Sequence, residues 1–234
     1  MITFLIPTFE EKDNISILIN NINELKISHP YTFFFIDDNS NDGSKNIFKK
    51  ISSDNNNVNY FIRKNKKKDL TKSLLEGLEK VTSEYVFILD CDLQHELEKI
   101  PNMIDLIMNQ KYDLVIGKRD LKNIKSKTRR FFTIIGTKFS YLAGIEKIED
   151  PLSGFFIIKT NLFKSLSYKI NNSGFKILIS IIFYLNNNKN ICEVPIKFKN
   201  RKFGSSKFSL KIIYLFIIQI LFLRFQKIKN NDKY

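Results

Sequence analysis

Short apolar runs that end in polar turns limit most strongly what this chain can fold into. The runs at 2–6, 33–36 and 85–89 are rich in Ile, Leu, Val and Phe. Runs of this length bounded by turn residues are typical of buried strands. Segments of helical length separate them, so the order predicts βαβ units and an α/β fold with a mostly parallel sheet.

The alternation continues along most of the chain. Strands are expected at 2–6, 32–37, 58–62, 85–90, 113–117, 154–159 and 191–198, and helices at 14–26, 44–53, 69–81, 97–110, 129–145 and 174–186. Right-handed crossovers bring the carboxyl ends of successive parallel strands to one side. The 234 residues suit one large domain with a buried core. The charged turn at 63–69 is expected to lie in solvent.

The segment Asp90-Cys91-Asp92-Leu93-Gln94-His95 directly follows the run at 85–89. Open α/β sheets bind ligands at the carboxyl ends of their strands. Two carboxylates followed by an amide oxygen offer hard ligands for Mg²⁺ or Mn²⁺. Such a metal would hold a diphosphate and neutralise its growing charge. The competing interpretation is a solvated Asp turn that caps the next helix.

Two further turns place polar groups at the same predicted edge of the sheet. The run at 33–36 ends in the turn 37–44, and Pro7-Thr8-Phe9-Glu10-Glu11 follows the strand at 2–6. An ordinary strand-turn-helix corner accounts for residues 42–44, because Asn, Asp, Ser and Gly form turns and cap helices. It explains less well the adjacent acids Asp37 and Asp38. The convergence of three such turns favours a binding site.

Seven segments, in this order, carry a resemblance to a known family. They are PTFEE (7–11), IDDNSNDGS (36–44), LDCDLQH (89–95), DLVIGKR (113–119), DPLSGFFIIK (150–159), GFKILI (174–179) and EVPIKFKNRKFGSSKF (193–208). The chain resembles a family 2 glycosyltransferase of the polyisoprenyl-phosphate type, similar to dolichol-phosphate mannose synthases. It departs from the family's usual residues at Phe9 (Tyr), Glu10 (Asn), Ser180 (Glu) and Ser205 (Glu).

The resemblance implies a GT-A fold, with a Rossmann-like, mostly parallel sheet flanked by helices. It also implies an inverting, metal-dependent transfer of a hexose of the mannose or glucose type from GDP or UDP to a polyprenyl phosphate. Asp92 and Gln94 would bind the metal, with Asp90 close behind. The residues implied to bind the nucleotide sugar are Pro7, Phe9, Glu11, Ile36, Asp38, Asp90, Cys91, Asp92 and Gln94. Phe9 keeps a stacking face without the tyrosine hydroxyl.

The acceptor phosphate needs cations rather than a base, because its second pKa near ~6 leaves it largely dianionic at neutral pH. The resemblance places Arg119, Arg129, Arg130, Arg201 and Lys207 around it, and we expect Asp90, Asp92, Arg119, Arg201 and Lys207 to be the catalytic residues. The loop Gly204-Ser205-Ser206 would close over the diphosphate. The histidines are only two, His29 and His95.

Three other functions compete with this one. Transfer to a sugar hydroxyl in polysaccharide synthesis would require a base, for which an acid near Asp150 is the candidate. A nucleotidyltransferase would carry a Gly-rich basic loop after the first strand, where this chain has Glu10 and Glu11. A nucleic-acid binder would explain the charge but not the acids at the strand ends, so we expect no nucleic-acid partner.

Composition adds a preference for acidic partners. The formal net charge is +14 and the pI about 9.6, although abundant Lys, Asn, Ile and Phe also suggest a low-GC genome. Cys91 and Cys192 show no metal spacing, which favours a reduced, cytoplasmic protein. The first residues lack the basic stretch and long apolar run of a signal peptide.

The C-terminal part predicts attachment to a membrane surface. The apolar run at 212–223 is twelve residues, or roughly 18 Å of helix, whereas a span needs ~30 Å. The flanking cations are Lys207, Lys211, Arg224, Lys227 and Lys229. We therefore expect a catalytic domain at 1–208 and an interfacial helix at 209–234, peripheral on the cytoplasmic face. Docking of this helix on the domain itself, or on a small membrane protein, is the alternative.

Overall fold

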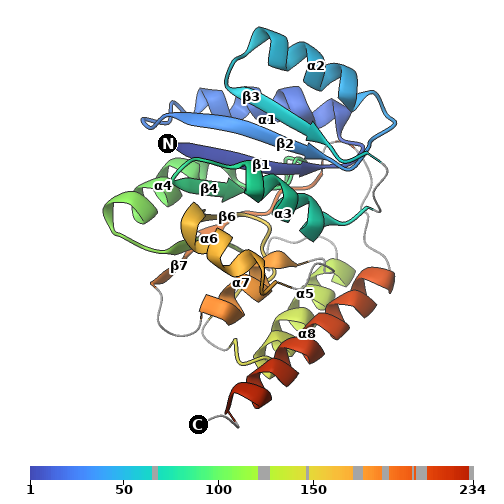
Figure 1. The fold of residues 1–234 in the computed structure, drawn as a ribbon, viewed down its shortest axis with the longest axis vertical. Helices are drawn as coiled ribbons and strands as arrows, with labels where there is room; N and C mark the ends of the chain where they lie inside the picture. The colour runs from blue at the N-terminus through green and yellow to red at the C-terminus, as the bar shows by residue number, and fades with distance from the viewer. Residues whose placement is uncertain are drawn as a thin grey trace.

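The computed structural model places seven strands in one sheet within the residues it describes, which are 1–64, 68–120, 127–145, 148–170, 176–185, 190–201, 203 and 210–231. The strand order is β3-β2-β1-β4-β6-β5-β7 (Figure 1). The strands are β1 (Ile2–Thr8), β2 (Tyr31–Asp37), β3 (Val58–Ile62), β4 (Tyr85–Ile88), β5 (Leu114–Arg119), β6 (Phe156–Lys159) and β7 (Ile191–Ile196). Only β6 runs antiparallel to its neighbours, so the predicted mostly parallel α/β sheet is confirmed.

The register brings the three predicted acidic turns to adjacent strand ends. Strand β1 pairs in parallel with β2 on one side, where Thr8 lies opposite Asp37. It pairs in parallel with β4 on the other side, where Leu5 lies opposite Ile88. Strands in a sheet lie about 4.8 Å apart. The turns that leave β2, β1 and β4 are therefore neighbours at one edge.

Helices cover both faces of the sheet and make a three-layer fold. One core lies under α1 (Lys12–Glu24), α2 (Ser44–Asp54) and α4 (Ile100–Asn109). The other lies under α3 (Leu70–Lys80), α6 (Thr160–Ser167) and α7 (Ile177–Leu185), with α5 (Lys127–Leu142) and α8 (Leu210–Asn231) beside it (Figure 1). Successive side chains of each strand enter opposite cores because side chains alternate across a strand. Phe4 enters the first core and Leu5 the second.

Glycine allows α3 to lie close to the sheet at the end of β2. A Cβ built on Gly77 would lie 2.7 Å from side-chain atoms of both Leu5 and Ile36. A larger residue there would force these side chains, or the helix itself, to move. Helix α3 thereby packs tightly behind the turn that follows β2, which belongs to the candidate site.

Several predicted elements differ in extent from the structure. The predicted helix at 97–110 begins as a 3₁₀ turn, Leu97–Lys99, before α4. Helix α6 was not predicted, because it follows β6 without a turn residue between them. Helix α7 begins at Ile177, after the described residue Lys176, and is described to Leu185; residues 174, 175 and 186 of the predicted helix at 174–186 lie outside the described part.

Helix α8 is longer than the predicted apolar run and packs on the domain. Ile220 and Leu223 are buried, and the Gln219 side chain donates hydrogen bonds to the Lys176 carbonyl (3.1 Å) and the Ser180 hydroxyl (2.9 Å). Arg224 donates to the carbonyl of Leu142 at the end of α5. None of the helices in the described ranges has the length and apolarity needed to cross a membrane.

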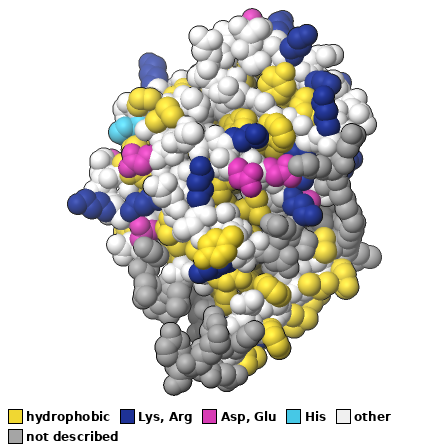
Figure 2. Space-filling model, viewed as in Figure 1, with side chains coloured by type: hydrophobic (Ala, Val, Ile, Leu, Met, Phe, Trp, Pro, Cys, Tyr) yellow, Lys and Arg dark blue, Asp and Glu magenta, His cyan; other side chains and the backbone are white. Residues whose placement is uncertain are grey.

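The outer side of α8 carries apolar side chains. Tyr214, Leu221 and Phe225 are 60–70 % exposed. They are spaced by seven and four residues, which places them on one side of the helix. Hydrophobic side chains are visible along this edge in Figure 2, where Figure 1 shows α8. The helix is therefore docked on the domain and exposes several apolar side chains to the outside.

Candidate active site

The three turns share an unusual backbone feature. Glu10, Asn39 and Leu93 have φ angles of 53°, 59° and 58°. Left-handed conformations are uncommon for residues other than glycine, and they concentrate at functional sites. Each turn follows one of the adjacent strands β1, β2 and β4. The three corners are thus built alike, at one edge of the sheet.

Two of the acids in the second turn hold the corner together. Asp37 accepts hydrogen bonds from the amide (2.7 Å) and hydroxyl (2.6 Å) of Ser40, and the Ser40 hydroxyl accepts from the amide of Glu10. Asp42 accepts from the amide of Lys12 at the start of α1. These carboxylates are structural, because their oxygens satisfy backbone donors of the first and second turns.

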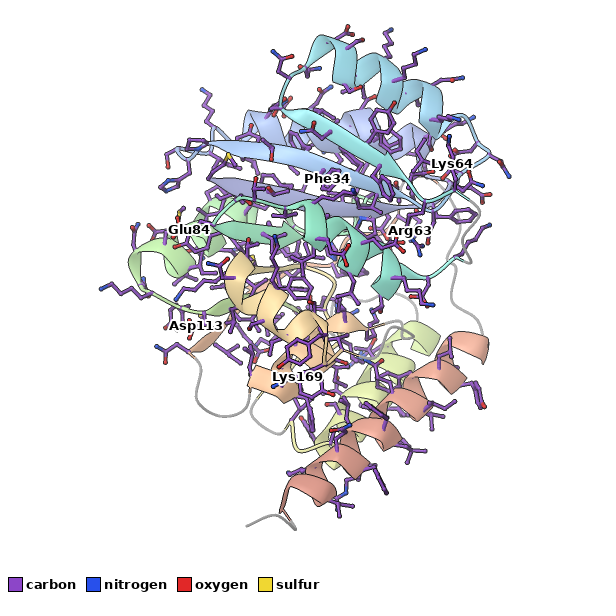
Figure 3. The ribbon with its side chains drawn as sticks, viewed as in Figure 1. Phe34, Arg63, Lys64, Glu84, Asp113 and Lys169 are labelled. Carbon is purple, nitrogen blue, oxygen red and sulfur yellow. The ribbon has the colours of Figure 1, made fainter. Side chains whose placement is uncertain are left out.

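Asp38 is held by a buried arginine that the sequence did not single out. Its carboxylate forms an ion pair with Arg63 and accepts a hydrogen bond from the amide of Asp69 (3.0 Å). The Arg63 side chain is 1 % exposed, so the prediction that the whole turn at 63–69 lies in solvent was wrong. In Figure 3, Arg63 lies near the strand ends above α3, whereas Lys64 lies at the periphery.

The Arg63 guanidinium also binds helix α3. It donates to the Ser73 hydroxyl (3.0 Å) and to the Glu76 carboxylate (3.1 Å). Burial would lower the pKa of Arg63, but Glu76 and Asp38 raise it, so the group stays charged. The available signal was its place directly after β3, at the edge where the other turns gather. The lysines that follow Arg63 in the sequence made the whole segment resemble a solvated charged turn.

The same loop contacts the predicted stacking residue. The Lys68 ammonium lies 3.5 Å from the centre of the Phe9 ring. Phe9 is partly exposed, whereas Pro7, Ile36 and Cys91 are buried in or beside the strands. An ammonium over an aromatic face is a favourable contact. The loop between β3 and α3 therefore borders the predicted nucleotide pocket at both Asp38 and Phe9.

Glu11 and Asp92 meet at one guanidinium. Arg201 donates to Asp92 with Nη2 at 2.7 Å from Oδ2, and its Nη1 lies 3.8 Å from Oε1 of Glu11. The side chains of Glu11 and Asp92 are 8 % and 6 % exposed. The structure thus brings together residues from the first turn, the fourth-strand turn and the segment after β7.

Gln94 connects the loop of the predicted metal ligands, Asp92 and Gln94, to the segment after β7. Its side-chain nitrogen donates to the carbonyl of Lys199 (2.9 Å), and the Lys199 amide donates to the Gln94 carbonyl (2.7 Å). The Gln94 amide in turn donates to Asp92. The bond to Lys199 fixes the side-chain amide next to the Asp92 loop, and the role of Gln94 as a metal ligand stays a prediction.

Asp90 lies beside a glycine and a buried histidine. Its side chain is 40 % exposed, and Oδ2 lies 3.8 Å from Nε2 of His95. His95 stacks on Phe155 with ring centres 4.8 Å apart. Burial lowers the pKa of His95, although Asp90 and Asp92 act in the opposite direction. Gly154 provides the space for Asp90, since the three atoms nearest to an added Cβ would all belong to its carboxylate.

Arg119 is paired with Asp150 inside the protein. Its Nε and Nη2 donate to the two carboxylate oxygens, each at 2.7 Å, and its amide donates to the same group at 3.0 Å. Burial would raise the pKa of Asp150, but Arg119 lowers it. Glu193 accepts from the amide of Asp150, which fixes the pair to β7.

The remaining predicted cations are placed unevenly. Arg130 is exposed on α5, and Arg129 lies in the same helix with its side chain outside the described part. Lys207 and the loop at 204–206 also lie outside the described residues. The structure therefore brings Arg201 to the acids and places Arg119 in an internal ion pair.

The donor set fits a divalent cation that shares its ligands with a phosphate. Within the described ranges, no three His, Cys, Asp or Glu side chains gather closely enough to hold a metal by themselves. Mg²⁺ is usually bound through one or two carboxylates together with substrate phosphates, rather than by an all-protein cage. Asp92 provides such a carboxylate, with Glu11 on the other side of Arg201.

Comparison with known families agrees with this geometry. The family model for glycosyl transferase family 2 matches residues 3–167, which extend from the second residue of β1 through β6 and include the three turns. The chain belongs to glycosyl transferase family 2. The expected resemblance is thereby confirmed at the level of the family.

Curated relatives in family 2 cover most of the chain. Dolichol-phosphate mannosyltransferase of Pyrococcus furiosus is 30% identical over 94% of this chain, which spans 62% of that relative's length. The enzymes of the same name from Mycosarcoma maydis and Saccharomyces cerevisiae are each 27% identical, over 93% and 92% of this chain and 76% and 84% of their own lengths.

Solved structures support the fold. Glucosyl-3-phosphoglycerate synthase from Mycobacterium tuberculosis, in complex with Mn²⁺, UDP and glucosyl-3-phosphoglycerate, superposes with a TM-score of 0.71 at 17% identity, covering 96% of this chain and 79% of that one. Its complex with Mn²⁺, UDP-glucose and phosphoglyceric acid gives 0.72 at 16% identity, with the same coverage. This similarity confirms the GT-A-like arrangement.

Proposed function

We propose that this family 2 protein is an inverting, metal-dependent glycosyltransferase that moves a hexose from a GDP- or UDP-sugar to a polyprenyl phosphate. The observation that carries the proposal is the meeting of Glu11 and Asp92 at Arg201, beside the Asp38 corner. Acids for the donor and a cation for phosphate thus share one site. The names of the curated relatives support the lipid-phosphate acceptor and a mannose-type sugar.

Asp92 and Gln94 are the residues that would hold Mg²⁺ or Mn²⁺. Bound there, the cation would act as a Lewis acid on the departing diphosphate. The complexes of the M. tuberculosis enzyme with Mn²⁺ and UDP support a divalent ion in this fold. Asp90, two residues before Asp92 and 40 % exposed, would orient the donor sugar.

The first two turns would bind the nucleoside. Carboxylates such as Glu11 and Asp38 accept hydrogen bonds from ring N–H groups and ribose hydroxyls. Phe9 offers a face for the base two residues after Pro7, which lies opposite the buried Ile36 in the sheet. Arg63 and the Asp69 amide hold Asp38 in a fixed orientation, so the pocket needs little rearrangement on binding.

The acids and bases of the site favour a phosphate acceptor over a hydroxyl. Transfer to a hydroxyl needs a base with a tuned pKa. Asp150, the candidate for that role, is bound by Arg119 and its pKa is lowered, which makes it a weak base. A lipid phosphate instead needs cations, and Arg201 is at the site while Lys207 follows six residues later. Attack by the phosphate oxygen opposite the departing nucleotide inverts the sugar carbon.

Membrane attachment would bring the enzyme to its lipid acceptor. Apolar side chains are exposed on α8 and also at the end of α5, where Leu142 is 51 % exposed and its carbonyl accepts from Arg224 of α8. Arg224 and Lys227 lie on the same helix as Leu221 and Phe225. Apolar and basic side chains together are typical of helices that lie in the interface of an anionic bilayer. We place the protein peripherally on the cytoplasmic face, with 1–208 as the catalytic domain.

Transfer of radiolabelled hexose from GDP- and UDP-sugars to extracted polyprenyl phosphate tests the proposal. Asp92→Asn is expected to abolish transfer and metal-dependent nucleotide binding while the protein stays folded. Asp105→Asn is the matched control, because Asp105 is an exposed acid on α4 whose carboxylate accepts from Asn109. Full transfer by Asp92→Asn would refute the metal assignment, and labelling of a saccharide instead of the lipid would favour the polysaccharide alternative.

A further inference from the structure

Arg201 neutralises two acids that the proposed function assigns to the donor and its metal. The guanidinium is 2.7 Å from Asp92 and 3.8 Å from Glu11, and both acids are nearly buried. Two carboxylates brought together in a poorly solvated place repel each other and cost free energy unless a cation lies between them. Arg201 supplies that cation from within the chain.

The backbone that carries Arg201 is fixed, but its side chain is accessible. Gln94 and Lys199 exchange hydrogen bonds, and the Lys197 amide donates to Glu96 (2.6 Å). These bonds attach the segment after β7 to the loop after β4. The Arg201 side chain is 21 % exposed, against 6 % for Asp92. Its guanidinium can therefore change partners by side-chain rotation, without moving the segment.

We infer, resting on the proposed function, that Arg201 is an exchangeable counter-ion that pairs with Asp92 and Glu11 in the ligand-free enzyme and with a phosphate during transfer. A divalent cation that binds Asp92 would compete with the guanidinium for the same carboxylate. Once displaced, Arg201 is left beside a phosphate, for which its planar donor fork is well suited. Arg201 is then a positioning residue for the acids and a contact for the phosphate.

This exchange links the binding of metal and phosphate. Metal alone must displace Arg201 without offering it another anion, so it binds weakly to the ligand-free protein. Metal together with a phosphate ligand gives Arg201 a new partner, so each tightens the binding of the other. Removing Arg201 should therefore have opposite effects, with stronger binding of metal alone and slower transfer.

Titration of Mn²⁺ into the full chain, followed by the loss of the free-ion electron paramagnetic resonance signal, tests the inference. Arg201→Gln is expected to bind Mn²⁺ alone roughly five- to tenfold more tightly than the wild type, the size of one partly buried charge contact. Lys199→Gln is the matched control. It removes the same charge from the same segment, but its ammonium pairs with Glu98 away from the site, so affinity should change less than about twofold.

A second arm measures the linkage. Adding GDP or UDP, or separately a short isoprenyl phosphate, should tighten Mn²⁺ binding more in the wild type than in Arg201→Gln, and the more effective phosphate is the partner of Arg201. Circular dichroism confirms that the variants are folded. Equal Mn²⁺ affinity of the wild type and Arg201→Gln, with binding lost in Asp92→Asn, would overturn the inference and leave the proposed function intact. Absence of Mn²⁺ binding to the wild type even with nucleotide would overturn both.

Discussion

Gly154→Ala is a perturbation that should displace Asp90 and little else. A Cβ at this position would lie 2.8 Å from Oδ2 of Asp90, and the next two atoms, at 3.3 and 3.4 Å, belong to the same carboxylate. Ordinary contacts begin near 3.4 Å. The carboxylate must therefore move by about half an ångström, and being 40 % exposed it has room to do so.

The expected result is a loss of rate without a loss of stability. Gly154 does not have a positive φ, so its backbone accepts alanine. Alanine lowers the conformational entropy of the unfolded chain, which raises the free energy of unfolding by ~0.4–1 kcal/mol. This gain offsets the cost of moving one flexible side chain. Misplacement by about 1 Å in an active site costs up to ~10²-fold in rate. For about half that shift we expect kcat to fall roughly tenfold, with the melting temperature nearly unchanged.

A double-mutant cycle shows whether the effect acts through Asp90. Transfer rates at saturating donor and acceptor are compared for the wild type, Gly154→Ala, Asp90→Ala and the double variant. If the methyl group acts on the carboxylate, adding Gly154→Ala to Asp90→Ala should change the rate little, because the group it displaces is gone. Losses that multiply in the double variant, or an unchanged rate in Gly154→Ala, would refute the reasoning.

Three further predictions concern the buried ion pairs and helix α8. Arg63→Met, measured by urea unfolding against the exposed neighbour Lys64→Met, should lower the free energy of unfolding by about 3–5 kcal/mol, because it removes a buried cation shared by two acids; a loss no larger than the control's would contradict this. The pKa of Asp150 is lowered on folding, so its ionised form stabilises the protein above the unfolded value near ~3.9, and that contribution disappears as pH falls through the lower folded pKa. Unfolding free energy should thus fall more steeply below pH ~5 in the wild type than in Asp150→Asn, and equal slopes would exclude the linkage. Leu221→Asp should reduce sedimentation with anionic vesicles while transfer to a water-soluble acceptor persists, and undiminished sedimentation would exclude α8 as the attachment surface.

Local sequence was informative wherever one short segment contained the whole signal. The runs before Asp37 and Asp90 predicted strands because side-chain burial and chain length are local properties. The acids at their ends could be assigned to one edge of the sheet because parallel connections are right-handed. Helix α6 could not be predicted this way, since it begins where β6 ends and has no separate start signal.

Only the tertiary structure determined which distant residues form ion pairs with each other. The sequence indicated that the turns after β1, β2 and β4 carry chemistry, and it identified Arg201 as a cation for phosphate. It did not indicate that Arg201 binds Asp92, 109 positions away. Nor did it indicate that Arg63, at the start of a lysine-rich turn, is buried and neutralises Asp38. Charge pairs depend on which surfaces the sheet order brings together, and the cost of burying a charge depends on its final surroundings. Neither quantity is present in any local pattern of residues.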